Sequence, residues 1–302
     1  MYQSILTPLD GSAFGEHALP LARSIARRAK AKLQVVHVHE SKSDRLLTFH
    51  TLDPAVPEAE RAYLHQVARR LATESEVAVD TALISGPVTD ALQTQAMLTK
   101  ADLLVMATHG HGPLSRAWLG SVADRLVRSL PLPILLVRSQ ETVPEFTREP
   151  DLRHILIPLD GSALAEQVIR PATALGALMA AGYTLLRVIP PVRLKGFDPT
   201  GSEMYEQDES PLLGQHRREA EYYLDQVAGG LRAQGLSVQT RVVVHPHAAT
   251  AILEEAHAGT VDLLALATHG RGGLPRLLLG SVADKVLRGT AIPVLLHRPQ
   301  TR

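Results

Sequence analysis

The chain of 302 residues repeats itself, and this repeat constrains its fold more than any other feature. The run Ala-Thr-His-Gly at 107–110, followed nine residues later by Gly-Ser at 120–121, recurs at 267–270 and 280–281. Over 107–138 and 267–298, 18 of 32 positions are identical without a gap. Two further blocks, 5–13 and 155–163, differ at one position of nine. Distant blocks that repeat in the same order predict a duplicated domain.

Composition excludes several classes of protein. Lys plus Arg equals Asp plus Glu at 31 each, so no global field attracts nucleic acid or an anionic membrane. The chain has no cysteine, which excludes disulfides and thiolate chemistry and fits the cytoplasm. The first expected strand begins too close to Met1 to leave room for a signal peptide. Apolar runs such as 133–137 are far shorter than the roughly 20 residues of a membrane span. We therefore expect a cytoplasmic protein that binds neither nucleic acid nor membrane.

Short β-branched runs alternate with helical patterns in each half, as in βαβ units with a parallel sheet. In the first half we expect strands at 5–9, 33–38, 77–84, 103–107 and 134–137. Between them we expect helices at 16–29, 58–72, 88–99 and 121–129. The segments 102–107 and 262–267 are almost wholly apolar after their first residue, which is typical of a strand covered on both faces.

The offset between the halves predicts their boundaries. Asp10 matches Asp160 at an offset of 150, whereas Gly110 matches Gly270 at 160, so ten residues are inserted between them. We assign these to 190–213, a segment rich in Pro, Gly, Asp and Glu that is irregular like its counterpart 40–57. Each loop is either a lid over the carboxyl ends of the strands or a disordered connection. The predicted organisation is a domain at 1–140, a linker at 141–152 and a domain at 153–302.

The repeated Gly-rich block has the chemistry of an anion site. A buried strand ends at Ala107, Gly110 permits a positive φ and close approach of the backbone, and a helix begins near Gly120-Ser121. Free N–H groups and the dipole at a helix N-terminus favour anions, so a phosphate chain fits between the turn and the helix. The alternative is that Ser121 and Ser281 simply cap their helices.

Asp10 follows the first strand in the run Pro-Leu-Asp-Gly-Ser and is the second polar element of the predicted site. If the sheet has a flavodoxin-like switch point, Asp10 lies beside the fourth strand. Its carboxylate can accept hydrogen bonds from a ribose hydroxyl or an exocyclic amine. The alternative is that Asp10 caps the helix beginning near Ala13, while Ser12 binds the ligand.

These motifs together resemble the universal stress protein family. The pattern is Gly-x2-Gly-x9-Gly-Ser after an apolar strand, with Pro-x-Asp-Gly-Ser at the first strand, Gly-Ser-Val-Ala-Asp-x-x-x-Arg, and a closing Pro-x-Leu-Leu strand. The resemblance covers both halves except for the two loops and the linker. It implies two Rossmann-like five-stranded parallel-sheet domains in tandem, with flavodoxin-like strand order. It also implies that their last strands, 134–137 and 294–296, join as an intrachain pseudo-dimer.

The resemblance further implies an ATP site in each half, because the motif in nucleotide-binding members of the family holds the phosphates and ribose of ATP. In this sequence the matching positions are Asp10, Val38, Met106, Ala107, Gly110, Gly120, Ser121, Val122, Asp160, Val188, Leu266, Ala267, Gly270, Gly280, Ser281 and Val282. The aspartates and the strand-two valines are implied at the adenine. Ala107 and Ala267 depart from the motif, whose first residue is Gly. An alanine hinders close backbone approach without blocking it, provided that its φ is negative.

Other patterns weigh less. His109 and His269 follow the fourth strands. Arg116, Arg271 and Arg276 on the following loops are either phosphate ligands or solvated surface residues. The pairs His37/His39 and His245/His247 lack a third ligand in sequence, so no metal site is expected. The sequence contains no P-loop, no Gly-x-Gly-x-x-Gly after the first strand, and no Gly-x-Ser-x-Gly elbow.

The leading prediction is a tandem universal stress protein that binds ATP in both halves in the response to stress, with Mg²⁺ carried by the phosphates. We find no evident general base or arginine finger, so we expect slow hydrolysis at most and do not class the chain as an enzyme. The alternatives are an interaction module of the same fold that binds no nucleotide, and an authentic ATPase or phosphotransferase. A protein partner and a homodimer of the whole chain stay open.

Overall fold

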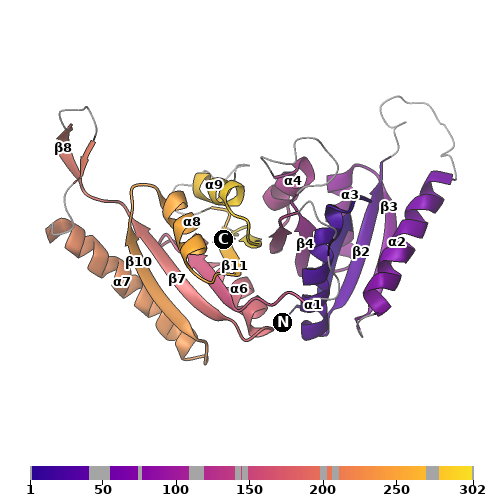
Figure 1. The fold of residues 1–302 in the computed structure, drawn as a ribbon, viewed down its shortest axis with the longest axis horizontal. Helices are drawn as coiled ribbons and strands as arrows, with labels where there is room; N and C mark the ends of the chain where they lie inside the picture. Colours follow the sequence, from indigo (N-terminus) through magenta and orange to yellow (C-terminus); the bar gives the residue numbers. More distant parts are fainter. Residues whose placement is uncertain are drawn as a thin grey trace.

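The computed structural model describes residues 2–40, 55–73, 77–108, 119–139, 144, 149–197, 203–205, 211–269 and 279–300. The two halves stand side by side, with α2 at one end of the molecule and α7 at the other (Figure 1). The strands of the first half are β1 Ser4–Leu9, β2 Lys32–His39, β3 Val79–Ser85, β4 Leu103–Ala107 and β5 Ile134–Val137. Its helices are the 3₁₀ turn η1 Gly15–Ala18, α1 Leu19–Ala29, α2 Ala55–Thr73, α3 Val88–Leu98 and α4 Ser121–Ser129.

The second half repeats this order with one addition. Its strands are β6 His154–Pro158, β7 Gly182–Ile189, β8 Arg193–Phe197, β9 Glu203–Tyr205, β10 Val238–Val244, β11 Leu263–Ala267 and β12 Val294–His297. Its helices are α5 Ala163–Glu166, α6 Ile169–Ala177, α7 Pro211–Arg232, α8 Ala248–Ala258 and α9 Ser281–Gly289. The expected alternation of strands and helices is therefore present in both halves.

One sheet runs through both halves in the order β10-β7-β6-β11-β12-β5-β4-β1-β2-β3. All neighbours within each half are parallel, and β12 pairs with β5 antiparallel through Val294↔Leu136, Leu295↔Leu135 and Leu296↔Ile134. The expected joining of the last strands into an intrachain pseudo-dimer is confirmed. The strand order of each half is 3-2-1-4-5, so the flavodoxin-like order 2-1-3-4-5 is wrong. The expected neighbours, strands one and four, are adjacent in both halves.

Two apolar cores cover the two faces of this sheet. One contains side chains of α1, α2, α6 and α7, including Ile25, Leu64, Leu175 and Leu224. The other contains side chains of α3, α4, α8 and α9, including Leu92, Leu126, Ile252 and Val286. Successive strand residues alternate between them, as the pleat requires. Both cores continue across the β5–β12 seam, with Leu135 and Leu295 in the first and Leu136 and Leu296 in the second.

The halves are also tied together outside the sheet. The Tyr2 hydroxyl donates to the carbonyl of Pro171 at 2.9 Å, which connects the start of the first half to α6. The hydroxyl of Ser24 on α1 donates to the Pro150 carbonyl at 3.1 Å, and Leu152 is buried in the core of the α1 face. The end of the predicted linker is thus fixed to helix α1.

Two local expectations are corrected. The helix expected at 16–29 is divided into η1 and α1, because Pro20 lacks an N–H and fits the first turn of a new helix. The insertion at 190–213 was expected to be irregular, yet it contains the antiparallel hairpin β8–β9 and the start of α7. The hairpin projects at the end of the molecule formed by α7 and β10 (Figure 1). A turn-forming run, Asp-Pro-Thr-Gly-Ser at 198–202, joins its strands in the sequence.

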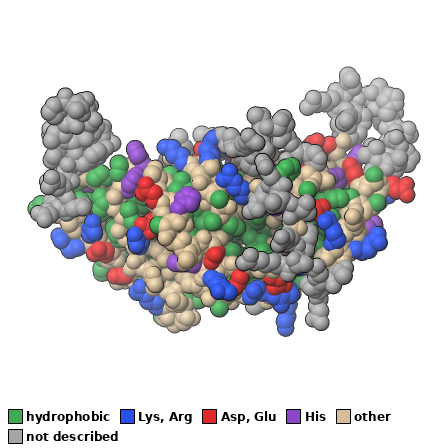
Figure 2. All heavy atoms as spheres, viewed as in Figure 1, with side chains coloured by type: hydrophobic (Ala, Val, Ile, Leu, Met, Phe, Trp, Pro, Cys, Tyr) green, Lys and Arg blue, Asp and Glu red, His purple; other side chains and the backbone are tan. Residues whose placement is uncertain are grey.

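The surface agrees with the balanced composition. On the face shown in Figure 2, Lys and Arg side chains are interspersed with Asp and Glu rather than gathered in one region. The described residues drawn on that face form no single-sign patch of the kind that steers a polyanion.

Candidate functional site

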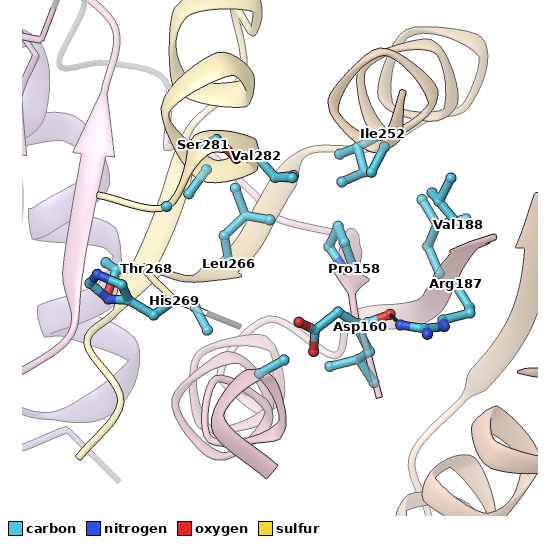
Figure 3. Close-up of a pocket in the computed structure, with 17 residues that line it drawn as sticks. Pro158, Asp160, Arg187, Val188, Ile252, Leu266, Thr268, His269, Ser281 and Val282 are labelled. Carbon is cyan, nitrogen blue, oxygen red and sulfur yellow. Dashed lines mark hydrogen bonds between the residues drawn. The ribbon is translucent and has the colours of Figure 1, made fainter. Parts of the chain in front are cut away.

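A cavity of about 250 Å³ lies at the carboxyl ends of β6, β7 and β11 in the second half (Figure 3). Its walls come from these strand ends and from the starts of α5, α8 and α9. It opens where the chain order of the sheet reverses between β6 and β11, the position at which open α/β sheets bind ligands. The lining residues are Pro158, Leu159, Asp160, Ala165, Leu186, Arg187, Val188, Ala248, Ile252, Leu266, Ala267, Thr268, His269, Gly280, Ser281, Val282 and Ala283.

The structure brings together most of the residues that the sequence predicts for the nucleotide site of this half. Those lining the cavity are Asp160, Val188, Leu266, Ala267, Gly280, Ser281 and Val282. Gly270 lies outside the described residues. Among the described residues between Ile189 and His247, none lines this cavity.

The matching residues of the first half occupy the same elements. Asp10 follows β1 and Val38 lies in β2, while Met106 and Ala107 end β4. Gly120, Ser121 and Val122 form the start of α4. Gly110 and His109 lie outside the described residues.

The Asp-Gly-Ser turn is organised by its serine as well as its aspartate. Asp160 Oδ1 accepts hydrogen bonds from the Ser162 backbone N–H at 2.9 Å and the Ser162 hydroxyl at 2.6 Å. The Ser162 hydroxyl in turn accepts from the Ala165 N–H at 3.2 Å and so caps α5. Gly161 has a φ of +80°, which the turn requires and which favours glycine.

The same turn recurs in the first half. Asp10 Oδ1 accepts from the Ser12 N–H at 3.0 Å and the Ser12 hydroxyl at 2.6 Å, and that hydroxyl accepts from the Gly15 N–H at 3.1 Å. The first-turn N–H that the sequence left open to the aspartate is therefore bonded by the serine hydroxyl in both halves. The serine bonds the first turn because its short hydroxyl reaches that N–H, and the aspartate fixes the serine.

The helices that follow the Gly-rich blocks begin at a glycine. Gly120 and Gly280 are the N-cap residues of α4 and α9, and neither helix has a side-chain cap. The explanation that Ser121 and Ser281 serve as caps is thus wrong, because both are already the first helical residues. The first helical bond of α9 runs from the Asp284 N–H to the Gly280 carbonyl at 2.9 Å. The N–H groups of residues 281–283 consequently have no acceptor within the helix and are available to an anion.

The alanines that replace the motif's first glycine adopt ordinary backbone conformations. Among the described residues, a positive φ outside glycine occurs at Lys30, Lys100 and Ala180. Ala107 and Ala267 therefore meet the condition under which a Cβ hinders close approach of a ligand without blocking it.

Sequence reasoning missed several lining residues. Arg187 comes one residue before Val188, and its Nη1 donates to the Leu159 carbonyl at 3.2 Å (Figure 3). Ala248 and Ile252 reach the cavity from α8. The sequence does contain an indication that Arg187 has a function, because it is the only charged residue in the strand Gly182–Ile189. No sequence pattern indicates the two α8 residues, because α8 comes close to the site only in the folded structure.

His269, which follows the fourth strand of the second half, lines the cavity beside Thr268. Its Nδ1 lies 3.0 Å from the Thr268 hydroxyl. Its Nε2 is buried without a hydrogen-bond partner among the described residues.

A half-buried phenol lies near the aspartate of the second site. The Tyr223 hydroxyl donates to Glu166 Oε1 at 2.9 Å. Burial, the neighbouring Glu166 and the charge of Asp160 raise the pKa of Tyr223, and Arg187 opposes this. The phenol therefore stays protonated at neutral pH and acts as a fixed donor beside the site.

One histidine pair does gain a neighbouring carboxylate. His39 Nδ1 lies 3.0 Å from Glu60 Oε2, and His37 Nε2 lies 3.5 Å from Glu60 Oε1. His245 and His247 instead form a local hydrogen bond, in which the His247 backbone N–H donates to His245 Nδ1 at 2.9 Å. In the described ranges, no group of three or more His, Cys, Asp or Glu side chains is arranged to hold a metal ion.

The model of the universal stress protein family matches residues 1–138 and again residues 151–298. The universal stress protein Rv2005c of Mycobacterium tuberculosis is 29% identical over 238 residues, which cover 76% of this chain and 70% of the relative. The universal stress protein Slr1230 of Synechocystis is 23% identical and is covered completely, with 98% of this chain aligned.

Solved structures agree on the fold. The crystal structure of a universal stress protein from Archaeoglobus fulgidus superposes with a TM-score of 0.68 at 15% identity, covering 98% of this chain and 96% of that one.

None of the helices in the described part of the chain has the length and apolar character that a bilayer span requires. The chain belongs to the universal stress protein family and carries the family's domain twice.

Proposed function

We propose that this tandem universal stress protein binds ATP at the carboxyl end of the sheet in each half, in the response to stress. The observation that carries the proposal is the single cavity lined by Asp160, Val188, Leu266, Ala267, Gly280, Ser281 and Val282. The sequence motifs predict these residues from three distant parts of the chain. Their convergence supports a shared ligand.

The residues around the cavity support separate positions for the base and ribose and for the phosphates of the nucleotide. Its volume of about 250 Å³ is slightly below the ~300–1,000 Å³ typical of complete ligand pockets. We assign the base and ribose to the space between Asp160, Val188 and Ile252. The phosphates would then lie at Gly280-Ser281, where the N–H groups of the first turn of α9 favour negative charge. Mg²⁺ would be carried by the phosphates rather than by a protein ligand set.

The proposal does not include efficient catalysis. Arg187 is the cationic residue that lines the cavity among the described residues, and it is held at the Leu159 carbonyl near the proposed base rather than the phosphates. We therefore propose a binding protein with slow hydrolysis at most, acting in the cytoplasm through a protein partner. Steady ATP turnover with release of ADP would support the competing ATPase instead.

Thermal unfolding tests the proposal. A ligand present at about 100 times its Kd and bound only to the folded state adds about 2.7 kcal/mol to stability. For domains of this size the melting temperature should rise by about 5 °C or more. The protein must first be shown to be free of bound nucleotide by its absorbance ratio. No shift at millimolar Mg-ATP would favour the interaction module, consistent with lost affinity at Ala107 and Ala267.

A further inference from the structure

His37 of β2 and Arg187 of β7 occupy the same position in the two halves, at the offset of 150 that relates the first strands. His37 Nδ1 lies 2.9 Å from the Leu9 carbonyl oxygen, and Arg187 Nη1 donates to the Leu159 carbonyl at 3.2 Å. Each carbonyl belongs to the peptide that leads into the aspartate of the same site. The histidine ring also lies against the turn itself, since a Cβ added to Gly11 would be 3.8 Å from His37 Cε1. The two side chains therefore hold the same peptide in each proposed nucleotide site.

The second ring nitrogen of His37 faces a carboxylate. Its Nε2 lies 3.5 Å from Glu60 Oε1 of α2. A neutral imidazole carries one N–H, so it can donate to the Leu9 carbonyl or towards Glu60 but not to both. If Nδ1 donates to the carbonyl, the neutral ring directs the lone pair of Nε2 towards the negative charge. The imidazolium ion has an N–H at each nitrogen and satisfies both acceptors.

The surroundings of His37 contain one other group that changes charge near neutral pH. Of the side-chain types present, histidine alone has an ordinary pKa between about pH 6 and pH 8. The charged or titratable groups that face His37 or its edge-on neighbour Tyr63 are Asp10, Glu16, His39, Glu60, Tyr63 and Arg70. Burial and the nearby carboxylates raise the pKa of Tyr63, so its phenol stays neutral. His39, whose Nδ1 lies 3.0 Å from Glu60 Oε2, is thus the control for His37.

The second half has a permanent cation at this position. A guanidinium stays protonated over this whole range, whatever its other partners are. Arg187 shares with Glu219 the lining of a second cavity of about 380 Å³. A carboxylate near Arg187 changes neither its charge nor its bond to the Leu159 carbonyl. The same peptide is therefore held by a titratable donor in the first half and by a permanent one in the second.

We propose that His37 is a positioning residue of the first nucleotide site that acts as an imidazolium ion, so that the first site binds nucleotide more tightly at mildly acidic than at mildly alkaline pH. As the pH rises, the ring loses one proton and gives up either its bond to Leu9 or its attraction to Glu60. Either loss loosens the turn that carries Asp10. Arg187 performs the same task in the second site at both pH values. This inference rests on the proposed binding of ATP in both halves.

Isothermal titration of Mg-ATP at about pH 6 and about pH 8 tests the inference. Gly280→Val leaves the first site and Gly120→Val leaves the second. The ratio of the Kd of the first site to that of the second cancels the titration of the ATP phosphates, which is common to both. This ratio should rise at least about twofold from the lower to the higher pH, the lower bound for the net loss of one hydrogen bond. A constant ratio would overturn the inference.

Substitutions at His37 separate positioning from packing. His37→Asn keeps an amide N–H near the place of Nδ1 but cannot take up a proton, so the ratio should no longer depend on pH. His37→Leu removes the donor and should weaken binding at the first site at both pH values. Glu60→Gln should reduce the pH dependence, because an amide can donate to the lone pair of Nε2. His39→Asn is the matched control and should leave the pH dependence unchanged. Loss of the pH dependence in His39→Asn but not in His37→Asn would assign it to the wrong histidine and overturn the inference.

Two measurements need neither glycine variant. In the otherwise unmodified chain, His37→Asn should reduce the change in ATP affinity between the two pH values. The ring ¹⁵N signals of His37 in the nucleotide-free protein, assigned by their absence in His37→Asn, should show both nitrogens protonated at about pH 6. One bare nitrogen at this pH, in a protein that binds ATP, would overturn the inference alone. Failure of ATP to bind the unmodified chain at either pH would overturn the proposed function together with it.

Discussion

The backbone N–H of Gly280 donates to the carbonyl oxygen of Thr268 at 2.8 Å, and a Cβ added to Gly280 would lie 2.8 Å from that same oxygen. In the first half, the bond from Gly120 to the Thr108 carbonyl is also 2.8 Å, but an added Cβ would lie 3.1 Å away. Contacts below 3.0 Å are essentially never made by real Cβ atoms. The turn at the second site is therefore the tighter of the two, and a side chain at either glycine would press on this carbonyl.

Valine at these glycines should remove nucleotide binding from its own half. Gly280→Val and Gly120→Val each fill the space proposed for a phosphate and press against a carbonyl that cannot move freely. Isothermal titration should show the loss of one of two sites in each single variant. Gly280→Ala should weaken binding more than Gly120→Ala, because its Cβ has less room.

A glycine outside the site serves as the control. Gly230 lies in α7 with no atom within 4 Å of an added Cβ. Gly230→Ala should leave ATP binding unchanged and stabilise the helix by about 0.5–1 kcal/mol. If the double variant Gly120→Val, Gly280→Val keeps the ATP affinity of the unmodified chain, the two turns are helix starts and nothing more.

Ser281→Ala should weaken ATP binding without weakening the fold. The lost hydroxyl is a donor to a charged ligand, and such bonds contribute about 1.5–3 kcal/mol. The free energy of unfolding should change by less than about 0.5 kcal/mol, since α9 has no side-chain cap to lose. Titration of ATP and urea denaturation of the nucleotide-free protein measure the two effects. Ser121→Ala should behave alike in the first half.

Ser162→Ala provides the matched contrast. Its hydroxyl accepts the Ala165 N–H as the cap of α5, so its loss should cost about 0.5–2 kcal/mol of stability. A larger loss of stability in Ser281→Ala than in Ser162→Ala would contradict this assignment of roles.

His297 should make stability depend on pH. Burial lowers the pKa of His297 below its usual 6.5, and its Nδ1 is buried with no hydrogen-bond partner among the described residues. The unfolded chain therefore takes up a proton near pH 6.5 that the folded chain resists. The free energy of unfolding should fall as the pH drops below this value, and the contribution should be complete above it.

The repeat supplies the variant that tests this prediction. The residue matching His297 in the first half is Val137. His297→Val should remove part of the decline in urea-unfolding free energy between about pH 7 and pH 5. The same pH slope in the variant and the unmodified chain would show that other groups cause the decline.

The seam should make the two halves unfold together. Leu135 and Leu295 pair across it, and each side chain is 0% exposed. Leu135→Ala or Leu295→Ala should cost about 2–5 kcal/mol and lower a single shared transition in calorimetry. Leu98→Ala, at a side chain 73% exposed, should change stability by less than about 0.5 kcal/mol. Two separate transitions in the unmodified chain would contradict cooperative unfolding.

Much of this fold could be predicted from the sequence because its elements are strongly patterned. The expected strands 103–107 and 134–137 coincide with β4 and β5, and the expected helix 121–129 coincides with α4. In each case an apolar run or a helical pattern is bounded by a clear start or stop. The resemblance to the universal stress protein family, whose motif recurs in both halves, then predicted seven of the seventeen residues that line the cavity.

The remainder depends on information that patterns do not contain. Periodicity identifies strands but not their lateral order, which is why the flavodoxin-like order was wrong while the adjacency of β1 and β4 was right. Patterns alone do not show that Ser162 caps the helix while Asp160 holds Ser162, because these roles follow from the distances of their hydrogen bonds. Ile252 reaches the cavity only because α8 packs on β7 and α9, a contact between distant parts of the sequence.

Joining both domains in one chain determines which domains can meet across the seam. Two separate single-domain proteins with interchangeable β5-like edges would assort into like and unlike pairs, in proportions set by their concentrations. Here β5 pairs with β12 of the same chain, so the half that carries His37 always faces the half that carries Arg187. The fusion therefore yields a heterodimer of fixed composition at any expression level. Either half can diverge in sequence without competing against copies of itself for its partner.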